Sequence, residues 1–148
     1  MPLTRDFLDG QLLIAMPNMT DPRFERTVVL VCAHDPAHAF GLIVNRPLSK
    51  VTLGDVLDRL EIPCSASARA ETVGFGGPVE MERGAVLHTL DYNGEGTRPA
   101  APGVALTQSR QILADIGDRD VRAPRRFLFL VGYAGWGPGQ LESEIAMN

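Results

Sequence analysis

Lysine is nearly absent from this sequence: Lys50 is the only one in 148 residues. The 14 lysine and arginine side chains are outnumbered by 18 aspartates and glutamates, and the formal net charge at pH 7 is −4. Proteins that bind nucleic acids carry a clear excess of positive charge. The composition therefore disfavours direct binding to nucleic acids, and we expect at most weak non-specific affinity for DNA.

Long hydrophobic runs and cysteines are scarce as well. No stretch approaches the roughly 18 uninterrupted apolar residues that span a bilayer, and residues 1–9 carry acids in place of the apolar core of a signal peptide. Cys32 and Cys64 are the only cysteines, so at most one disulfide can form. Cys32 ends an apolar run and is expected to be a small buried hydrophobe. These features predict a cytoplasmic protein that does not contact membranes.

What is present fits one folded domain that spans residues 1–148. Hydrophobic residues make up 45% of the sequence and charged residues 22%, close to the averages of soluble globular proteins. A chain of this length buries roughly two-thirds of its extended surface on folding, which is enough for a hydrophobic core. The 15 glycines and 11 prolines predict many turns between short elements. We expect mixed α and β structure without long helical bundles.

Short apolar runs rich in aliphatic and β-branched residues predict the strands. Three of these runs lie in the first third of the chain, and Asn45-Arg46-Pro47 is expected to end the third run because proline disfavours continued pairing. The most apolar run, 127–131, is expected at the centre of the sheet. The predicted strands are 10–16, 27–32, 40–44, 84–88, 104–106 and 127–131.

The spacing of apolar residues predicts three helices. The first begins with Thr52 and Asp55, which form the Ser/Thr-x-x-acid signal of a helix start. The second is expected to stop at Gly117, because glycine is common just after a helix. The predicted helices are 52–60, 107–116 and 140–147, and the predicted loops are 65–71 and 91–102.

The stretch Gly132–Gly139 is predicted to be a glycine-rich loop between the strand 127–131 and the last helix. This order of elements resembles a phosphate-binding loop, in which backbone N–H groups and the helix dipole hold an anion. The glycine spacing matches no nucleotide-binding motif, and Glu142 and Glu144 would repel a phosphate at the helix start. We therefore favour a tightly packed turn. Trp136 within it either fills the core or forms an interaction hot spot.

Two histidines flank an acid near the first strands. His34 and His38 lie on either side of Asp35, and imidazole and carboxylate groups suit divalent metals. Pro36 between them spoils the helical geometry that would bring both rings to one ion. The spacing favours solvent-exposed loop histidines over a metal site, and we expect no metal or cofactor.

His88 follows an apolar run and is expected at the end of a strand beside Glu80 and Glu82. There it acts either as a general base or as a hydrogen-bonded structural residue. No G-x-S-x-G or C-x-x-C motif supplies a nucleophile, and neither cysteine has a flanking basic residue that would lower its pKa. The sequence favours a protein without catalytic activity and leaves the enzyme alternative open.

The densest basic cluster consists of Arg122, Arg125 and Arg126. Arginine side chains suit phosphates and carboxylates, because the planar guanidinium group donates two parallel hydrogen bonds. Three acids lie immediately upstream: Asp115, Asp118 and Asp120. This mixture of charges favours a solvated, salt-bridged loop over a nucleic-acid site.

Three sequence blocks together resemble the YqgE/AlgH family of bacterial proteins and occur in the family's order. They are GQLLIAMPNMTDPRFERTVVLVCAHD with FGLIVNRPL, then GGPVEMERGAVLHT, then GYAGWGPGQLESEI. The resemblance runs from Gly10 to Asn148 and departs from the family at Ala39-Phe40-Gly41, where Gly-Ala-Met-Gly is usual. Family members continue past the last helix, so we expect this chain to lack their C-terminal segment.

The resemblance implies an α+β fold with a β-barrel-like, bifurcated sheet flanked by helices. It brings no catalytic residues, and it implies a proposed role in the regulation of transcription. Many of the positions that match the family's motifs are glycines and prolines, which suits backbone geometry better than chemistry. These positions are Pro17, Phe24, Gly41, Asn45, Arg46, Pro47, Gly76, Gly77, Pro78, His88, Gly132, Trp136, Gly139, Gln140 and Glu142.

Three functions remain as hypotheses. The first is a cytoplasmic binding or regulatory protein that acts through contacts with a protein partner. The second is a small-molecule-binding protein or enzyme with a pocket near Asn45, Arg46, His88 and the glycine-rich segments. The third is regulation by direct DNA binding, which the family's proposed role suggests and the charge opposes. The candidate contact residues for a ligand or partner are Asn45, Arg46, Gly76, Gly77, His88, Trp136, Gln140 and Glu142.

Overall fold

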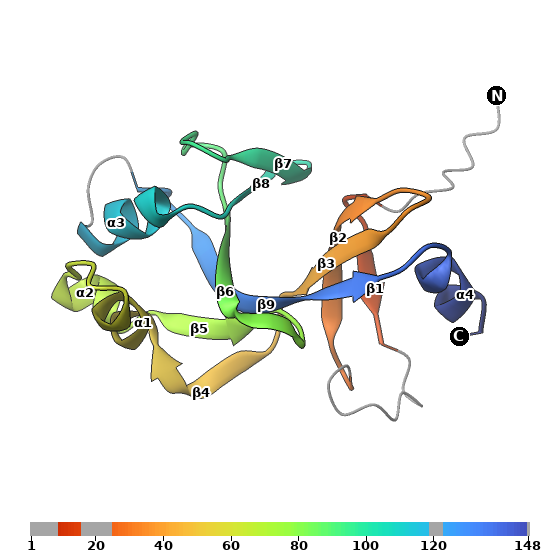
Figure 1. Cartoon of the computed structure of the whole chain (residues 1–148). Coiled ribbons are helices and arrows are strands. Elements are labelled where there is room, and N and C mark those ends of the chain that lie inside the picture. The colour runs from red at the N-terminus through yellow and green to blue at the C-terminus, as the bar shows by residue number, and fades with distance from the viewer. Residues whose placement is uncertain (1–8, 16–24, 119–122, 148) are drawn as a thin grey trace.

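The computed structural model describes residues 9–15, 25–118 and 123–147. Within them the chain forms an α+β fold of nine strands and four helices (Figure 1). The strands are β1 (Leu12–Ile14), β2 (Val28–His34), β3 (Ala39–Ile43), β4 (Pro47–Thr52), β5 (Thr72–Phe75), β6 (Val79–His88), β7 (Arg98–Ala101), β8 (Val104–Thr107) and β9 (Phe127–Trp136). The helices are α1 (Leu53–Arg59), α2 (Ala66–Arg69), α3 (Arg110–Asp118) and α4 (Gln140–Met147).

The strand β9 lies at the centre of the sheet, as predicted. The strand order is β1-β2-β3-β9-β6-β8-β7, and every neighbouring pair in it is antiparallel. The sheet curls so far that its two edges approach each other: a Cβ added to Gly10, just before β1, would lie 3.6 Å from the Cα of Ala101 in β7. The predicted barrel-like sheet flanked by helices is confirmed, and it has the form of a half-barrel (Figure 1).

The sheet forks along one edge of β9. The first half of β9 pairs with β5, which runs parallel to it from Val73 opposite Phe129. The second half pairs with β3, where Gly41 lies opposite Ala134. On the other edge, β6 pairs with β9 on both sides of the fork. The branch that leaves with β5 continues into β4, which completes the bifurcated sheet.

Three glycines allow the backbones to meet at this fork. A Cβ at Gly132 would overlap the carbonyl oxygen of Gly77, and a Cβ at Gly76 would overlap the carbonyl oxygen of Gly132. Gly76 also joins the branches, because its N–H donates to the Val131 carbonyl and its carbonyl accepts from the Ile43 N–H, each over 2.8 Å. Gly132 has a φ of +76°, which bends β9 at this point. Only glycine combines that conformation with such a close approach.

Successive residues of β9 face two different hydrophobic cores. Phe129 of β9 packs with Leu57 of α1 and Ile112 of α3 in the core between the helices and the sheet. Its neighbour Leu130 packs with Leu42 of β3 in the core inside the half-barrel. Because successive side chains of a strand point to opposite faces, one strand supplies both cores. The helix α4 lies at the far end of the molecule from α1, α2 and α3 (Figure 1).

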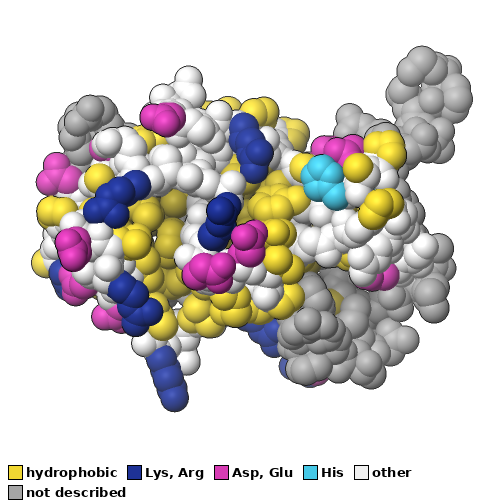
Figure 2. All heavy atoms as spheres, in the orientation of Figure 1, with side chains coloured by type: hydrophobic (Ala, Val, Ile, Leu, Met, Phe, Trp, Pro, Cys, Tyr) yellow, Lys and Arg dark blue, Asp and Glu magenta, His cyan; other side chains and the backbone are white. Residues whose placement is uncertain are grey.

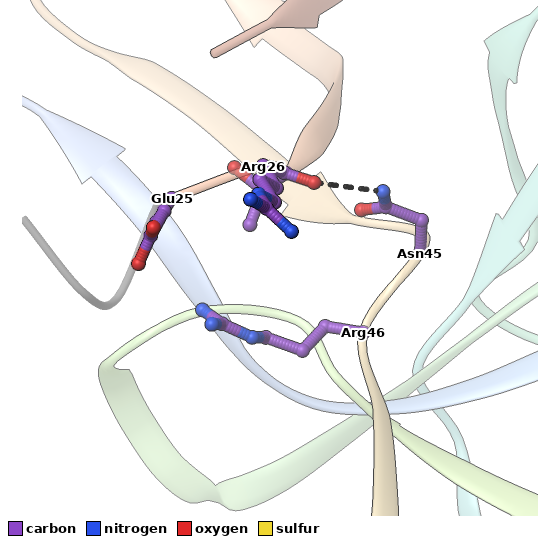
Figure 3. Close-up of a pocket in the computed structure, with 5 residues that line it drawn as sticks. Glu25, Arg26, Asn45 and Arg46 are labelled. Atoms are coloured by element: carbon purple, nitrogen blue, oxygen red, sulfur yellow. Dashed lines mark hydrogen bonds between the residues drawn. The ribbon is translucent and has the colours of Figure 1, made fainter. Parts of the chain in front are cut away.

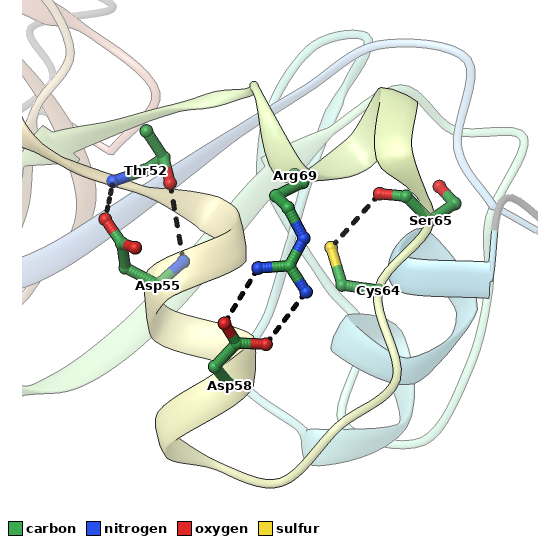
Figure 4. A network of polar contacts seen from close by, with 6 residues as sticks. All are labelled: Thr52, Asp55, Asp58, Cys64, Ser65 and Arg69. Atoms are coloured by element: carbon green, nitrogen blue, oxygen red, sulfur yellow. Dashed lines mark hydrogen bonds and ion pairs between the residues drawn. The ribbon is translucent and has the colours of Figure 1, made fainter.

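The predicted start of the first helix is confirmed in atomic detail. The Asp55 N–H donates to the Thr52 hydroxyl over 3.4 Å, and the Thr52 N–H donates to the Asp55 carboxylate over 3.0 Å, which makes a capping box (Figure 4). On the same helix, Asp58 accepts two hydrogen bonds from Arg69 of α2, at 2.7 and 2.9 Å. This bond lowers the pKa of Asp58 and ties the two helices together.

Two differences from the predicted strands involve Gly or Pro. The third predicted strand, β3, ends at Ile43 just before Asn45-Arg46-Pro47, as expected, but Pro47 begins a further strand, β4, at a position where the missing N–H costs no ladder bond. The predicted loop Gly132–Gly139 is wrong in its first half, because β9 continues to Trp136. Gly132 serves close packing against Gly77, whereas Gly139, with a φ of +71°, lies in the turn that precedes α4.

The polar segments also hold more structure than predicted. The segment 65–71 contains α2, started by the Ser65 hydroxyl, which accepts from the Ala68 N–H over 3.2 Å. The segment 91–102 ends in β7. The second helix begins at Arg110, and Gly117 lies inside it, where a side chain would clash with the Pro63 carbonyl. Met16, the turn at 17–22, Phe24, Asp120 and Arg122 lie outside the described residues.

Replacing Gly132 with alanine tests whether the close contact between Gly132 and Gly77 stabilises the forked sheet. We expect G132A to lower the free energy of unfolding by about 3 kcal/mol or more, because a steric clash adds to the cost of a positive φ. Gly96 is a matched control, since its φ is +79° and nothing lies within 4 Å of an added Cβ. G96A should cost about 1 kcal/mol. Urea unfolding followed by circular dichroism measures both, and equal losses would contradict the role of the Gly132–Gly77 contact.

Candidate functional site

A hollow of about 770 Å³ opens at the end of the half-barrel where β3 and β6 end and β9 begins. We call it the barrel mouth. Hydrophobic side chains form most of its lining: Leu30 and Leu87 belong to the half-barrel core, and Leu12 and Leu128 lie nearer the surface. Barrel mouths are frequent ligand sites. The lining residues are Gly10, Leu12, Leu30, Val44, Glu71, Leu87, His88, Thr89, 101–104 and 125–128.

Part of the hydrophobic surface around this hollow is open to solvent. Leu12 and Leu128 of the barrel mouth are 59% and 44% exposed, and Ile14 and Leu90 outside it are 75% and 61% exposed. Figure 2 shows hydrophobic side chains gathered across the middle of one face of the molecule, with basic and acidic side chains around them. Exposed apolar groups next to a hollow indicate a place where another molecule binds.

Arg125 and Arg126 form the basic edge of the barrel mouth, and hydrogen bonds hold their backbone in place. The Arg126 N–H donates to the Thr89 hydroxyl over 3.3 Å, and the Thr89 N–H donates to the Arg126 carbonyl over 3.1 Å. The Arg125 N–H donates to Asp91 over 3.0 Å. Hydrogen bonds from the Thr89 hydroxyl and the Arg125 N–H lower the pKa of Asp91. The start of β9 is therefore anchored while both arginine side chains are exposed.

His88 is 3% exposed and takes part in a chain of hydrogen bonds. Its Nδ1 lies 2.7 Å from the Thr89 carbonyl, so this nitrogen is the donor. Its Nε2 lies 2.7 Å from the Thr107 hydroxyl, which lies 2.7 Å from the Thr97 hydroxyl, and that hydroxyl accepts from the Gly94 N–H over 3.0 Å. Each donor in this series of hydrogen bonds has an acceptor when Nδ1 of His88 donates and Nε2 accepts. Of the two roles predicted for His88, a general base or a hydrogen-bonded structural residue, the geometry fits the structural one.

The predicted neighbours of His88 are elsewhere. Glu80 and Glu82 lie near the beginning of β6, whereas His88 is its last residue and pairs with Phe127. A strand advances by about 3.3 Å per residue, which puts the backbone of Glu82 roughly 20 Å and that of Glu80 roughly 26 Å along the strand from His88. The acid–base pair that the sequence suggested does not assemble.

Asn45 and Arg46 line a second, polar hollow of about 290 Å³, together with Glu25, Arg26 and Thr27 (Figure 3). The Asn45 side chain has a structural task there. Its Oδ1 accepts from the Val28 N–H over 2.8 Å, and its Nδ2 donates to the Arg26 carbonyl over 3.1 Å. The Arg46 carbonyl accepts from the Phe75 N–H over 2.7 Å. Both residues thereby connect β2 and β5 to the segment between β3 and β4.

Trp136 and Gln140 meet at the opposite end of β9. The Trp136 indole N–H donates to Glu144 over 3.1 Å, and the Gln140 amide donates to the same carboxylate over 3.0 Å. Gln140 also accepts from the Gly137 N–H over 2.9 Å. Trp136 packs with buried Leu141. These contacts attach α4 to the end of the sheet, and the Glu142 side chain lies outside the described residues.

The residues predicted to share one pocket therefore lie in separate places. His88 lines the barrel mouth, Asn45 and Arg46 line the polar hollow, and Trp136 and Gln140 hold α4. Gly76 and Gly77 form the fork of the sheet. Sequence reasoning missed the hydrophobic lining of the barrel mouth, because its leucines come from four strands that are distant in the chain.

The first two histidines also differ from each other. His34 ends β2 and is 5% exposed, so the expected exposed loop position is wrong for this residue, while His38 is exposed as predicted. N–H groups of His38 and Ala37 hydrogen-bond to Asp35 and lower the pKa of its carboxyl group. Within the described residues, no three His, Cys, Asp or Glu side chains are grouped to hold a metal ion. None of the described helices is long and apolar enough to cross a membrane.

Comparison with known proteins shows which protein family has a sequence similar to this chain. The family model described as AlgH-like matches residues 12–148. A UPF0301 protein of Caulobacter vibrioides is 50% identical over 144 residues, which is 97% of this chain and 73% of that protein. A UPF0301 protein of Jannaschia sp. is 48% identical over 148 residues, which is 99% of this chain and 76% of that protein.

Two solved structures share the fold. The solution structure of the AlgH protein from Pseudomonas aeruginosa matches with a TM-score of 0.81 and 34% identity, and the match covers 99% of this chain and 76% of that one. A crystal structure from Corynebacterium diphtheriae matches with a TM-score of 0.71 and 22% identity over 94% of this chain and 71% of that one. The chain is an α+β protein with a bifurcated half-barrel sheet. It belongs to the AlgH-like family, as its sequence blocks predicted.

Removal of the Thr107 hydroxyl tests the hydrogen-bond chain around His88. T107V keeps the shape of the side chain but leaves the buried Nε2 without its donor, so we expect a loss of about 2 kcal/mol in the free energy of unfolding. The control T72V changes an exposed threonine of β5 and should stay within about 0.5 kcal/mol of the unchanged protein. Nitrogen NMR of the histidine rings should show His88 protonated on Nδ1. A proton on Nε2 would contradict the series of hydrogen bonds from His88 to Thr107 and Thr97.

Reactivity of Cys32 tests how closed the half-barrel core is. Burial raises the pKa of this thiol to about 11, against a smaller opposing effect of Arg98. At pH 8 roughly one molecule in a thousand carries the thiolate. In a C64S variant, alkylation of Cys32 by iodoacetamide should be more than about a hundredfold slower in the folded than in the urea-unfolded protein. It should speed up as the pH rises toward 11, and a folded rate close to the unfolded one would refute this.

Proposed function

We propose that this chain is a cytoplasmic binding protein whose barrel mouth takes up a small molecule with an apolar body. The observation that carries the proposal is the mouth itself, a hollow of about 770 Å³ with a largely hydrophobic lining. Its volume is within the range of small-molecule sites, about 300–1,000 Å³. Leu12 and Leu128 are 59% and 44% exposed, so covering the exposed part of each favours binding by about 1 kcal/mol per side chain.

The polar groups at this site support binding better than catalysis. Both ring nitrogens of His88 are engaged in hydrogen bonds to Thr89 and Thr107, so the ring is committed to the structure around the mouth. A general base needs a free nitrogen within reach of the substrate. Ligand binding requires only shape, an apolar lining and a few polar groups at its edge.

A protein partner is the second candidate, and the edge strand β1 favours it. Its residues Leu12 and Ile14 are 59% and 75% exposed. Edge strands offer unpaired backbone groups to which a partner can add a strand. Any regulatory role would then act through such a contact, because the net charge of −4 opposes direct binding to DNA.

A neutral fluorescent probe, N-phenyl-1-naphthylamine, distinguishes the two candidates. The double variant L12Q/L128Q removes two exposed leucines of the barrel mouth, and we expect it to bind the probe at least about tenfold more weakly than the unchanged protein. The matched control I14Q/L90Q removes two apolar side chains that are even more exposed but lie outside the mouth, and it should bind as before.

Circular dichroism and thermal unfolding verify that both variants fold. If the unchanged protein does not take up the probe, the barrel mouth is not a ligand site. If the control loses as much binding as the mouth variant, the probe reports the general apolar surface, which favours the protein-partner alternative.

A further inference from the structure

We infer that the molecule bound in the barrel mouth is an organic anion, whose apolar part lies against the leucines and whose carboxylate or phosphate is held by Arg125 and Arg126. This inference rests on the proposed function and identifies the chemical class of its ligand. Four observations at the start of β9 carry it.

The first observation is position. Arg125 and Arg126 line the mouth directly before Phe127 and Leu128, which line it too. Two cationic side chains therefore stand beside an apolar wall on one continuous stretch of backbone. A ligand that fills the hollow and reaches its edge brings its end group to these arginines.

The second observation is that the guanidinium groups are available. Among the described residues, no hydrogen bond or ion pair engages either side chain; their backbone N–H and carbonyl groups are bonded to Thr89 and Asp91, and the charge of Arg125 has only a weak effect on the pKa of Asp91. The salt-bridged loop that the sequence suggested is not formed by these two arginines within the described chain. Each guanidinium group retains its fork of donors for an incoming oxyanion.

The third observation is preorganisation. Bonds of 3.0 to 3.3 Å from Asp91 and Thr89 hold the backbone of both arginines, and Thr89 follows the buried His88. The oxygens of Asp91 are already engaged by the Thr89 hydroxyl and the Arg125 N–H. The arginines thus project from a fixed base, which reduces the entropy lost when a ligand orders them.

The fourth observation is the charge of the lining. Among the lining residues that the structure describes, Glu71 is the one acidic residue, against Arg125 and Arg126. This described part of the lining therefore carries a net positive charge in a protein whose net charge is −4. An anion is favoured here over a neutral or cationic molecule of the same shape, because it gains two charge-assisted contacts.

Competition for the neutral probe tests the ligand class. Decanoate, decyl phosphate and decan-1-ol share one alkyl chain and differ in the end group. We expect both anions to displace the probe at roughly tenfold lower concentration than decan-1-ol. The variant R125Q/R126Q should lose this preference and keep its affinity for decan-1-ol. Which of the two anions competes better distinguishes a carboxylate from a phosphate ligand.

The control R59Q/R83Q removes the same charge from exposed positions on α1 and β6 outside the mouth, and it should retain the preference. Equal displacement by decanoate, decyl phosphate and decan-1-ol would overturn the inference and leave the binding proposal standing. Retention of the preference in R125Q/R126Q would also overturn it. Failure of all three compounds to compete would refute both proposals.

Discussion

The close approach of backbone at the fork of β9 is the constraint on which the rest of the structure depends. Gly132 and Gly77 touch where no side chain fits, and Gly76 bonds to both branches of the sheet. Because the strands meet at this distance, β9 can pair with β5 in its first half and with β3 in its second. The bifurcation, the curl of the sheet and the separation of the two cores all follow from this junction.

The curl of the sheet creates the barrel mouth, and the start of β9 contributes apolar and basic side chains to its lining. The core beneath α1 and α3 is covered by helices, and α4 covers a small core around Leu141, whereas the buried residues of the half-barrel core come from strands alone. The sheet stops short of a complete barrel, and its edges leave Leu12 and Leu128 partly exposed. A surface that the fold itself cannot cover is where a hydrophobic ligand gains most. Arg125 and Arg126 add charge selectivity to that surface.

Local signals in the sequence were reliable where one short segment decides the outcome. The capping box at Thr52 and Asp55, the strand 127–131 and its central place in the sheet are all present. Predictions from glycines were wrong where the glycine permits a close contact between segments that are distant in the sequence. Gly117 resembles a helix stop but lies inside α3 against Pro63, and the run from Gly132 resembles a loop but begins as strand. A glycine that ends an element and one that permits contact look alike in a sequence.

The sequence by itself determined the family, the α+β class and most of the elements, since those depend on composition, periodicity and short motifs. Only the tertiary structure decided which residues share a site. It placed His88 in a series of hydrogen bonds far from Glu80, separated it from the hollow of Asn45, and brought Leu12 and Leu128 into the lining of one hollow. The physical reason is that a site in a curled sheet is assembled across strands, and strand pairing between distant segments has no local signature.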